Sequence, residues 1–174
     1  MAAELEQVRR AVEEVPDPEL PPVTIGMLGM VHDVTVDGGT VSIELLPTFS
    51  GCPATEMISR DVVDAVRAIE GVEDVRVRFR FDPPWTPERI SAEGRERLRG
   101  FGIAPPQDAG THDVSPEGRP TLPLVAAACP CPYCGSTDTE RESMFGPTPC
   151  RDVRFCSNCQ QPFEAFKTIG APAT

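Results

Sequence analysis

Four cysteines near the C-terminus have the spacing of a metal site. They form two pairs, Cys131 with Cys134 and Cys156 with Cys159, and two residues separate the members of each pair. Each pair closes a tight knuckle whose sulfurs can point at one ion, so two knuckles supply the four ligands of a tetrahedral zinc site. The segment between the pairs is a little longer than the ~15–20 residues usual for this pattern, and a hairpin with a long loop accommodates the excess. Four thiolates also suit iron in a rubredoxin-like centre, so the spacing leaves the metal open.

Two further cysteines flank this group without joining it. Cys129 precedes the first pair in a Cys-Pro-Cys sequence, but only Cys131 begins a knuckle of the form CxxCG. Cys150 follows a proline and is poorly spaced from Cys156 for a ligand of the same ion. We expect both to be bystanders.

A seventh cysteine, Cys52, stands alone in the N-terminal half. The sequence Ser-Gly-Cys-Pro at residues 50–53 places its thiol on a glycine-containing turn just before a predicted helix. A helix N-terminus favours the thiolate and lowers the thiol pKa, which improves metal ligation and nucleophilicity. The alternative that local sequence leaves open is a small buried residue at a helix start, because free cysteines are commonly inert core residues.

Two carboxylates lie on a proline-rich loop at residues 16–22. Asp17 and Glu19 are separated there by one residue and could face a metal or a positive charge of a partner. A solvated loop that also caps a helix is the more common role for such a pair. His32 lies in a predicted strand, where a lone histidine is more often structural than a ligand. Trp85, the single tryptophan, is expected to serve packing or docking.

Composition and charge limit the classes of function. The chain has 174 residues, of which 40% are hydrophobic, enough for one ordinary domain plus a small module. Its 27 acidic and 16 basic residues give a formal net charge of −11, which disfavours nucleic-acid binding because phosphate backbones are repelled. The charged N-terminus has no long apolar run, so we expect neither a signal peptide nor a membrane span. Seven cysteines then fit a cytoplasmic chain that uses thiols for metals rather than for disulfides.

The hydrophobic pattern predicts the elements that position these residues. The expected elements are a helix over residues 4–15, a hairpin over 30–36 and 41–46, a helix that begins at 53 and ends before 71, a strand over 72–81 and a two-step helix over 86–100. This order, α-β-β-α-β-α, predicts an α+β sandwich over residues 1–103. A Pro/Gly-rich linker is expected at 104–128 and a small zinc-ribbon β module at 129–174. Such a ribbon is too small to fold without its metal.

No catalytic constellation accompanies these elements in the sequence. The chain has no GxSxG turn, no phosphate-binding loop and no HExxH helix, and only His32 and His112 could serve as imidazole bases. We therefore expect an accessory protein rather than a stand-alone enzyme.

Three motifs in the N-terminal half occur together. They are Asp17-Pro18-Glu19, Thr24-Ile25 followed by Leu28-Gly29-Met30-Val31, and Thr48-Phe49-Ser50-Gly51-Cys52-Pro53. In combination they resemble the MIP18 (DUF59) family. The resemblance implies an iron–sulfur cluster assembly domain in which Cys52 binds iron or a cluster transiently and Asp17 and Glu19 shape the site.

The fuller pattern is similar to one branch of this family, the accessory subunits of bacterial multicomponent monooxygenases. The segments that carry the likeness are Pro84-Trp85-Thr86, Ile90-Ser91 with Gly94, residues 102–106 and residues 162–167. This branch implies an oxygenase or reductase component as the partner that receives iron or a cluster. The alternative is a structural subunit that binds these components without handling a cluster. One thiolate cannot hold a cluster alone, so a homodimer that shares two Cys52 residues, or ligands from a partner, would complete the site.

Overall fold

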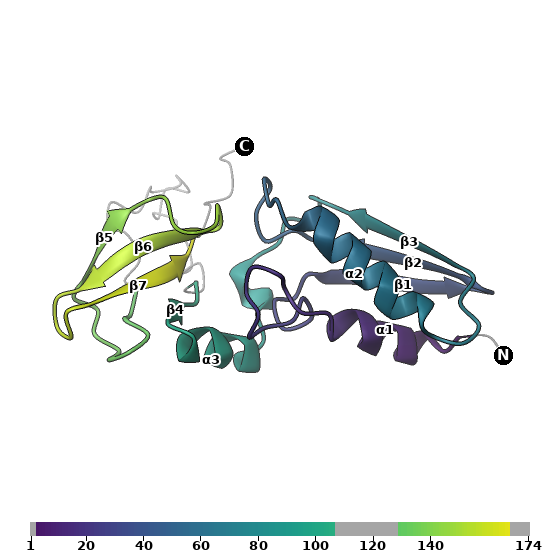
Figure 1. The fold of residues 1–174 in the computed structure, drawn as a ribbon, viewed down its shortest axis with the longest axis horizontal. Helices are drawn as coiled ribbons and strands as arrows, with labels where there is room; N and C mark the ends of the chain where they lie inside the picture. Colours follow the sequence, from purple (N-terminus) through teal and green to yellow (C-terminus); the bar gives the residue numbers. More distant parts are fainter. Residues whose placement is uncertain (1–2, 107–128, 168–174) are drawn as a thin grey trace, which may run out of the picture.

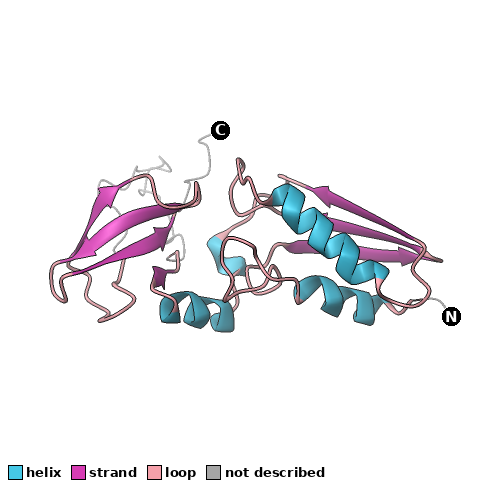
Figure 2. Ribbon diagram, in the orientation of Figure 1, coloured by secondary structure: helices cyan, strands magenta, loops and turns pink. Residues whose placement is uncertain are grey.

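The protein, described here as a computed structural model, has two parts. The structure describes residues 3–106 and 129–167, so most of the expected linker lies outside the described residues. Figure 1 shows a domain of helices and sheet at the N-terminal end and a ribbon of strands at the other end. Figure 2 shows that helices cover one sheet, whereas the ribbon consists of strands and loops.

The first domain is a two-layer sandwich. Its sheet has the order β1 (Val31–Asp37), β2 (Thr40–Leu45) and β3 (Asp74–Phe79), with β1 and β2 antiparallel and β2 and β3 parallel. Helices α1 (Leu5–Glu13) and α2 (Thr55–Arg67) pack on one face of this sheet (Figure 1). The predicted α+β class and element order are confirmed.

The alternation along β2 explains the sandwich. Val41, Ile43 and Leu45 are at most 1% exposed, and the side chains between them are partly exposed on the other face. The core is completed by the stripe of Ile58, Val62 and Val66 from α2, all fully buried. Burial of each such aliphatic side chain stabilises the fold by roughly 1.5–3 kcal/mol. The period-2 strand and the helical stripe therefore place apolar side chains of β2 and α2 in the same core.

The predicted two-step helix is also confirmed. A short 3-10 turn, η1 (Pro87–Arg89), precedes α3 (Ala92–Gly100). Ser91 caps α3, because its side-chain oxygen accepts a hydrogen bond from the backbone N–H of Gly94 at 3.0 Å. In Figure 1, α3 lies between the first domain and the ribbon.

The ribbon sheet contains a strand that the sequence pattern does not predict. Strands β5 (Thr139–Ser143), β6 (Arg151–Cys156) and β7 (Gln161–Phe166) are antiparallel, and β4 (Ile103–Ala104) pairs in parallel with β7. The sequence pattern predicts that the first domain ends at residue 103 and that the linker begins at 104. In the structure, both residues instead form an edge strand of the ribbon sheet. Such a short strand has no readable periodicity.

A ring pair joins the two parts. The Phe166 ring at the end of β7 lies 6.2 Å from that of Trp85, centroid to centroid, and Phe166 is buried in the core of the first domain. The indole N–H of Trp85 donates to the carbonyl oxygen of Leu28 at 2.7 Å. Trp85 therefore serves packing between the ribbon and the first domain.

Gly29 holds a backbone conformation that a side chain would strain. Its φ is +65°, and a Cβ there would collide with the carbonyl oxygen of Arg89. The left-handed conformation alone costs an L-residue roughly 1–2 kcal/mol. We expect Gly29→Ala to lower the free energy of unfolding in urea by about 3 kcal/mol or more, since the clash adds to this cost.

The matched control for this prediction is Gly38→Ala. Gly38 also has a left-handed φ, +58°, but its added Cβ meets nothing within 4 Å. Gly38→Ala should lower the free energy of unfolding only by the cost of the left-handed conformation, roughly 1–2 kcal/mol. Equal losses in the two variants would show that the Arg89 contact relaxes without penalty.

Candidate metal centres

The four paired cysteines come together at one end of the ribbon. Their ligand sulfurs all lie within 4.8 Å of one another. The Cys131 and Cys159 sulfurs are 3.7 Å apart, and those of Cys134 and Cys156 are 3.6 Å apart. An ion with metal–sulfur bonds of about 2.3 Å in tetrahedral geometry holds its sulfurs roughly 3.8 Å apart. These two separations are close to that value, so the group can hold one tetrahedral ion.

Both knuckles make the same turn. The backbone N–H of Gly135 donates to the carbonyl oxygen of Cys131 at 2.9 Å, and that of Gln160 donates to Cys156 at 2.8 Å. Each donor has a positive φ, 74° at Gly135 and 54° at Gln160. Positive φ angles and these backbone hydrogen bonds thus define the knuckle geometry, and the glycine after the first pair is its sequence signal.

Donors also surround the exposed ligand Cys134. The backbone N–H of Ser136 and the side-chain amide of Asn158 donate to its sulfur and hold the pKa of Cys134 below its usual range. Such bonds favour the thiolate that a metal needs. Cys129 packs beside the group, but its sulfur is outside the four.

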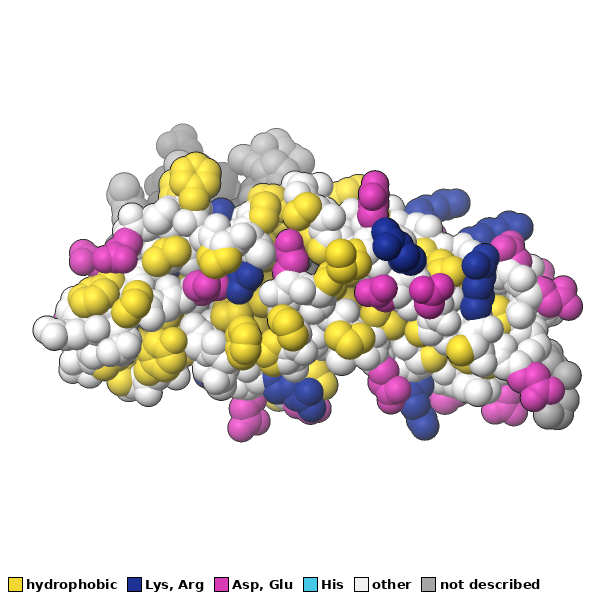
Figure 3. All heavy atoms as spheres, in the orientation of Figure 1, with side chains coloured by type: hydrophobic (Ala, Val, Ile, Leu, Met, Phe, Trp, Pro, Cys, Tyr) yellow, Lys and Arg dark blue, Asp and Glu magenta, His cyan; other side chains and the backbone are white. Residues whose placement is uncertain are grey.

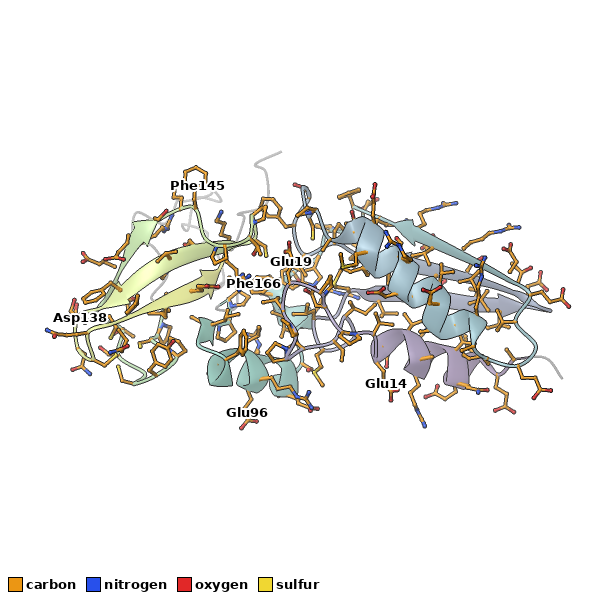
Figure 4. The ribbon with its side chains drawn as sticks, viewed as in Figure 1. Glu14, Glu19, Glu96, Asp138, Phe145 and Phe166 are labelled. Carbon is orange, nitrogen blue, oxygen red and sulfur yellow. The ribbon has the colours of Figure 1, made fainter. Side chains whose placement is uncertain are left out.

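The Asp17 side chain makes hydrogen bonds within its own loop. It is 7% exposed, and its Oδ1 accepts hydrogen bonds from the backbone N–H groups of Glu19 at 2.8 Å and Leu20 at 2.9 Å. Burial raises the pKa of Asp17, and these two bonds oppose that rise. An Asp that bonds the backbone ahead of it holds a tight turn. Asp17 therefore positions Glu19, which Figure 4 shows at the junction of the first domain and the ribbon.

Cys52 lies in the turn ahead of α2 and is partly buried. The prediction that its pKa is lowered is wrong: burial raises the pKa of the Cys52 thiol to about 11. A bond from the backbone N–H of Ala54 opposes this, while Glu19, Asp17 and Cys150 raise the pKa further. The helix dipole does not prevail because Cys52 precedes Thr55, the first residue of α2, and the dipole acts mainly within the first turn.

Cys150 lies outside the four-sulfur group, as expected, and the structure brings it close to Glu19. Cys150 precedes β6 and is 5% exposed. Its sulfur lies 4.0 Å from Oε2 of Glu19 and 3.1 Å from Oγ1 of Thr148. The only sequence signal is that Cys150 remains unassigned once the four-sulfur group is formed. His32 lies on β1, outside the four-sulfur group.

Two sequence families match the two parts of the chain. One is described as an iron-sulfur cluster assembly protein and matches residues 5–79, and the other is the PaaD zinc beta ribbon domain and matches residues 115–167. A solved DUF59 domain from Bacillus anthracis is 33% identical, with a TM-score of 0.51 over 54% of this chain and 90% of that chain. These matches define the class, an iron–sulfur cluster assembly domain of the MIP18 (DUF59) type joined to a zinc ribbon.

Relatives extend the match along the chain. A Porphyromonas gingivalis protein named Fe-S protein maturation auxiliary factor is 34% identical over 55% of this chain and 90% of its own length. An Escherichia coli (strain K12) protein provisionally named as the D component of 1,2-phenylacetyl-CoA epoxidase is 37% identical over 95% of this chain and 94% of its own length. This chain belongs to the family of this phenylacetyl-CoA epoxidase component.

In the part of the chain that the structure describes, no helix has both the length and the apolar character that crossing a membrane requires.

Proposed function

We propose that this protein is an accessory component of the phenylacetyl-CoA epoxidase, the multicomponent monooxygenase that forms the ring 1,2-epoxide in aerobic phenylacetate catabolism. It assembles iron or an iron–sulfur cluster, or delivers it to the oxygenase or the reductase component. Family membership supports the coarser role in iron–sulfur assembly. The observation that carries the proposal is that Asp17, Glu19 and Cys52 all fall within residues 5–79, which match the iron-sulfur cluster assembly family.

Each of the three residues has its own role in this proposal. Cys52 is the sulfur ligand, and its partial exposure leaves room for transfer to a recipient. Glu19 supplies a carboxylate, which Fe²⁺ accepts beside thiolate. Asp17 fixes the turn and so orients Glu19, since its Oδ1 is engaged by two backbone N–H groups.

The ribbon metal in this proposal is zinc with a structural role. A site closed by four thiolates has no open position for a substrate, which is typical of structural zinc. The ribbon then offers a docking surface to the recipient. Large hydrophobic side chains are exposed there, with Phe145 at 86% and Met144 at 61%. Figure 3 shows hydrophobic side chains gathered over the ribbon half, whereas charged side chains are frequent around α1 and α2.

A second candidate is a structural subunit that binds the oxygenase or reductase without handling a cluster. The raised pKa of Cys52, about 11, favours it, because a thiol that stays neutral at neutral pH is a poor nucleophile and an inert packing group. The exposed Phe145 and Met144 fit this role equally well.

Anaerobic reconstitution of the full-length protein separates the two candidates. The zinc-loaded chain is incubated with Fe²⁺ and sulfide and desalted, then analysed for metals and visible absorption. We expect about one zinc per chain by the four-ligand rule, together with a labile iron–sulfur absorption. A protein that retains zinc but no iron after reconstitution would favour the structural subunit.

A further inference from the structure

We propose that Cys150 of the ribbon is the second thiol ligand of the iron or cluster bound at Cys52, with Glu19 as a carboxylate ligand between them. This inference rests on the proposed function and adds to it a ligand from the second part of the chain. The site is then complete only when the ribbon is docked on the first domain.

The distance between Cys150 and Glu19 fits two ligands of one ion. The Cys150 sulfur and Oε2 of Glu19 are 4.0 Å apart. A sulfur and an oxygen bound to one tetrahedral ion at about 2.3 and 2.0 Å lie roughly 3.5 Å apart. A small rotation of the partly exposed Glu19 side chain closes this difference. The negative charge of Glu19 raises the pKa of both thiols, that of Cys150 and that of Cys52.

The backbone around Cys150 is held rigidly. The carbonyl oxygen of Cys150 accepts a hydrogen bond from the backbone N–H of Lys167 at 2.8 Å. The next residue, Arg151, is buried and bonds Oγ1 of Thr148 through Nε at 2.8 Å and Oε2 of Glu164 through Nη1 at 2.6 Å. These bonds tie the segment to β7 and so fix the Cys150 backbone relative to the ribbon sheet.

The charges at the junction favour a cation. Asp17 and Glu19 contribute negative charge, and Arg151, which opposes it, is already paired with Glu164. Each thiol that ligates gives up its proton to solvent, so one bound Fe²⁺ displaces two protons and meets two thiolates. The bound divalent ion then balances the negative charge of the two thiolates. Burial strengthens the attraction between the ion and these thiolates.

A thiol from the same chain changes how the site is completed. One thiolate cannot hold a cluster alone, and Cys150 supplies a second without a homodimer. The ligands then come from both the first domain and the ribbon. A recipient that draws the ribbon away would remove one ligand and promote release.

The test uses Co²⁺ as a spectroscopic probe of the zinc-loaded full-length protein, without oxygen. The intensity of sulfur-to-cobalt charge-transfer absorption scales with the number of thiolate bonds. The ribbon site, loaded with Co²⁺ instead of zinc, provides the four-thiolate reference in the same chain. The variants are Cys150→Ser, Cys150→Ala, Cys52→Ser and, as a matched control, Cys129→Ser. Zinc content and Trp85 fluorescence establish that each variant is folded.

We expect the second site of the wild type to show about half the reference intensity, as two thiolates of four require. Either Cys150 variant and Cys52→Ser should each lose half of that signal and bind Co²⁺ at least about tenfold more weakly. Cys129→Ser should match the wild type.

The other outcomes overturn separate statements. One-thiolate intensity in the wild type, or unchanged binding in both Cys150 variants while Cys52→Ser loses it, refutes the role of Cys150 and leaves the proposed function standing. Absence of any second site in the wild type refutes the Cys150 ligand, and iron-free protein after the reconstitution above refutes the proposed function itself. The charge-transfer intensity of the wild type tests the two-thiolate site even if a variant fails to fold.

Discussion

Cys52→Ser is expected to abolish support of epoxidase activity while leaving the protein folded. Serine keeps nearly the size of cysteine but replaces a soft sulfur ligand with a hydroxyl that binds iron weakly. The backbone bonds of the turn remain, because the N–H of Cys52 donates to Phe49 and its carbonyl oxygen accepts from Thr55. Loss of outer groups around a metal already costs about 10–100-fold, so loss of this ligand should lower activity by more than about 100-fold.

The measurement is phenylacetyl-CoA epoxidation in cells whose chromosomal copy is deleted and replaced by the variant. The control is Ser50→Ala, an exposed position on the same turn, which should restore full activity. Equal soluble amounts of the three proteins must be verified. Unimpaired activity with Cys52→Ser would sink the cluster-handling role and leave the structural subunit.

Cys156→Ser is expected to release the ribbon metal and unfold the ribbon. Cys156 is a fully buried member of the four-sulfur group, and its sulfur is 3.6 Å from that of Cys134. Structural zinc contributes about 10–16 kcal/mol of apparent binding free energy to the folding of small zinc modules. The ribbon core itself is a small cluster of buried residues that includes Cys131 and Cys156, so little else holds it together.

Trp85 reports this unfolding, because it is the only tryptophan and packs on Phe166 of β7. We expect a shift of its emission to longer wavelength, loss of zinc by elemental analysis, and retained helical circular dichroism from α1 and α2. Cys129→Ser is the control, since its sulfur is outside the four, and it should keep both zinc and emission. Retention of one zinc and unchanged emission by Cys156→Ser would contradict the four-ligand assignment.

Local patterns account for most of the fold. The stripe of Ile58, Val62 and Val66 and the alternation along β2 place side chains on one face by geometry alone, whatever the rest of the chain does. The zinc-ribbon knuckles are equally local, since each ligand pair lies within one turn. The strand β4 could not be predicted, because its two residues have no periodicity and are defined only by pairing with β7.

The environment of Cys52 could not be predicted for a different reason. A helix start is visible in sequence, but burial and the approach of Glu19 and Cys150 are not. Desolvation of the thiol raises its pKa, so the sign of the shift is opposite to the prediction.

The amino-acid sequence by itself determined the class of this protein, its two parts and the four-cysteine group, because those signals reside in short spacings. Only the tertiary structure determined which residues lie together where the ribbon packs on the first domain. Glu19 and Cys150 are separated by 131 positions and come within 4.0 Å because the β4–β7 pairing and the Trp85–Phe166 contact seat the ribbon on the first domain. No spacing rule predicts a contact between residues so far apart in the sequence, because the burial of apolar surface between distant segments is what brings them together.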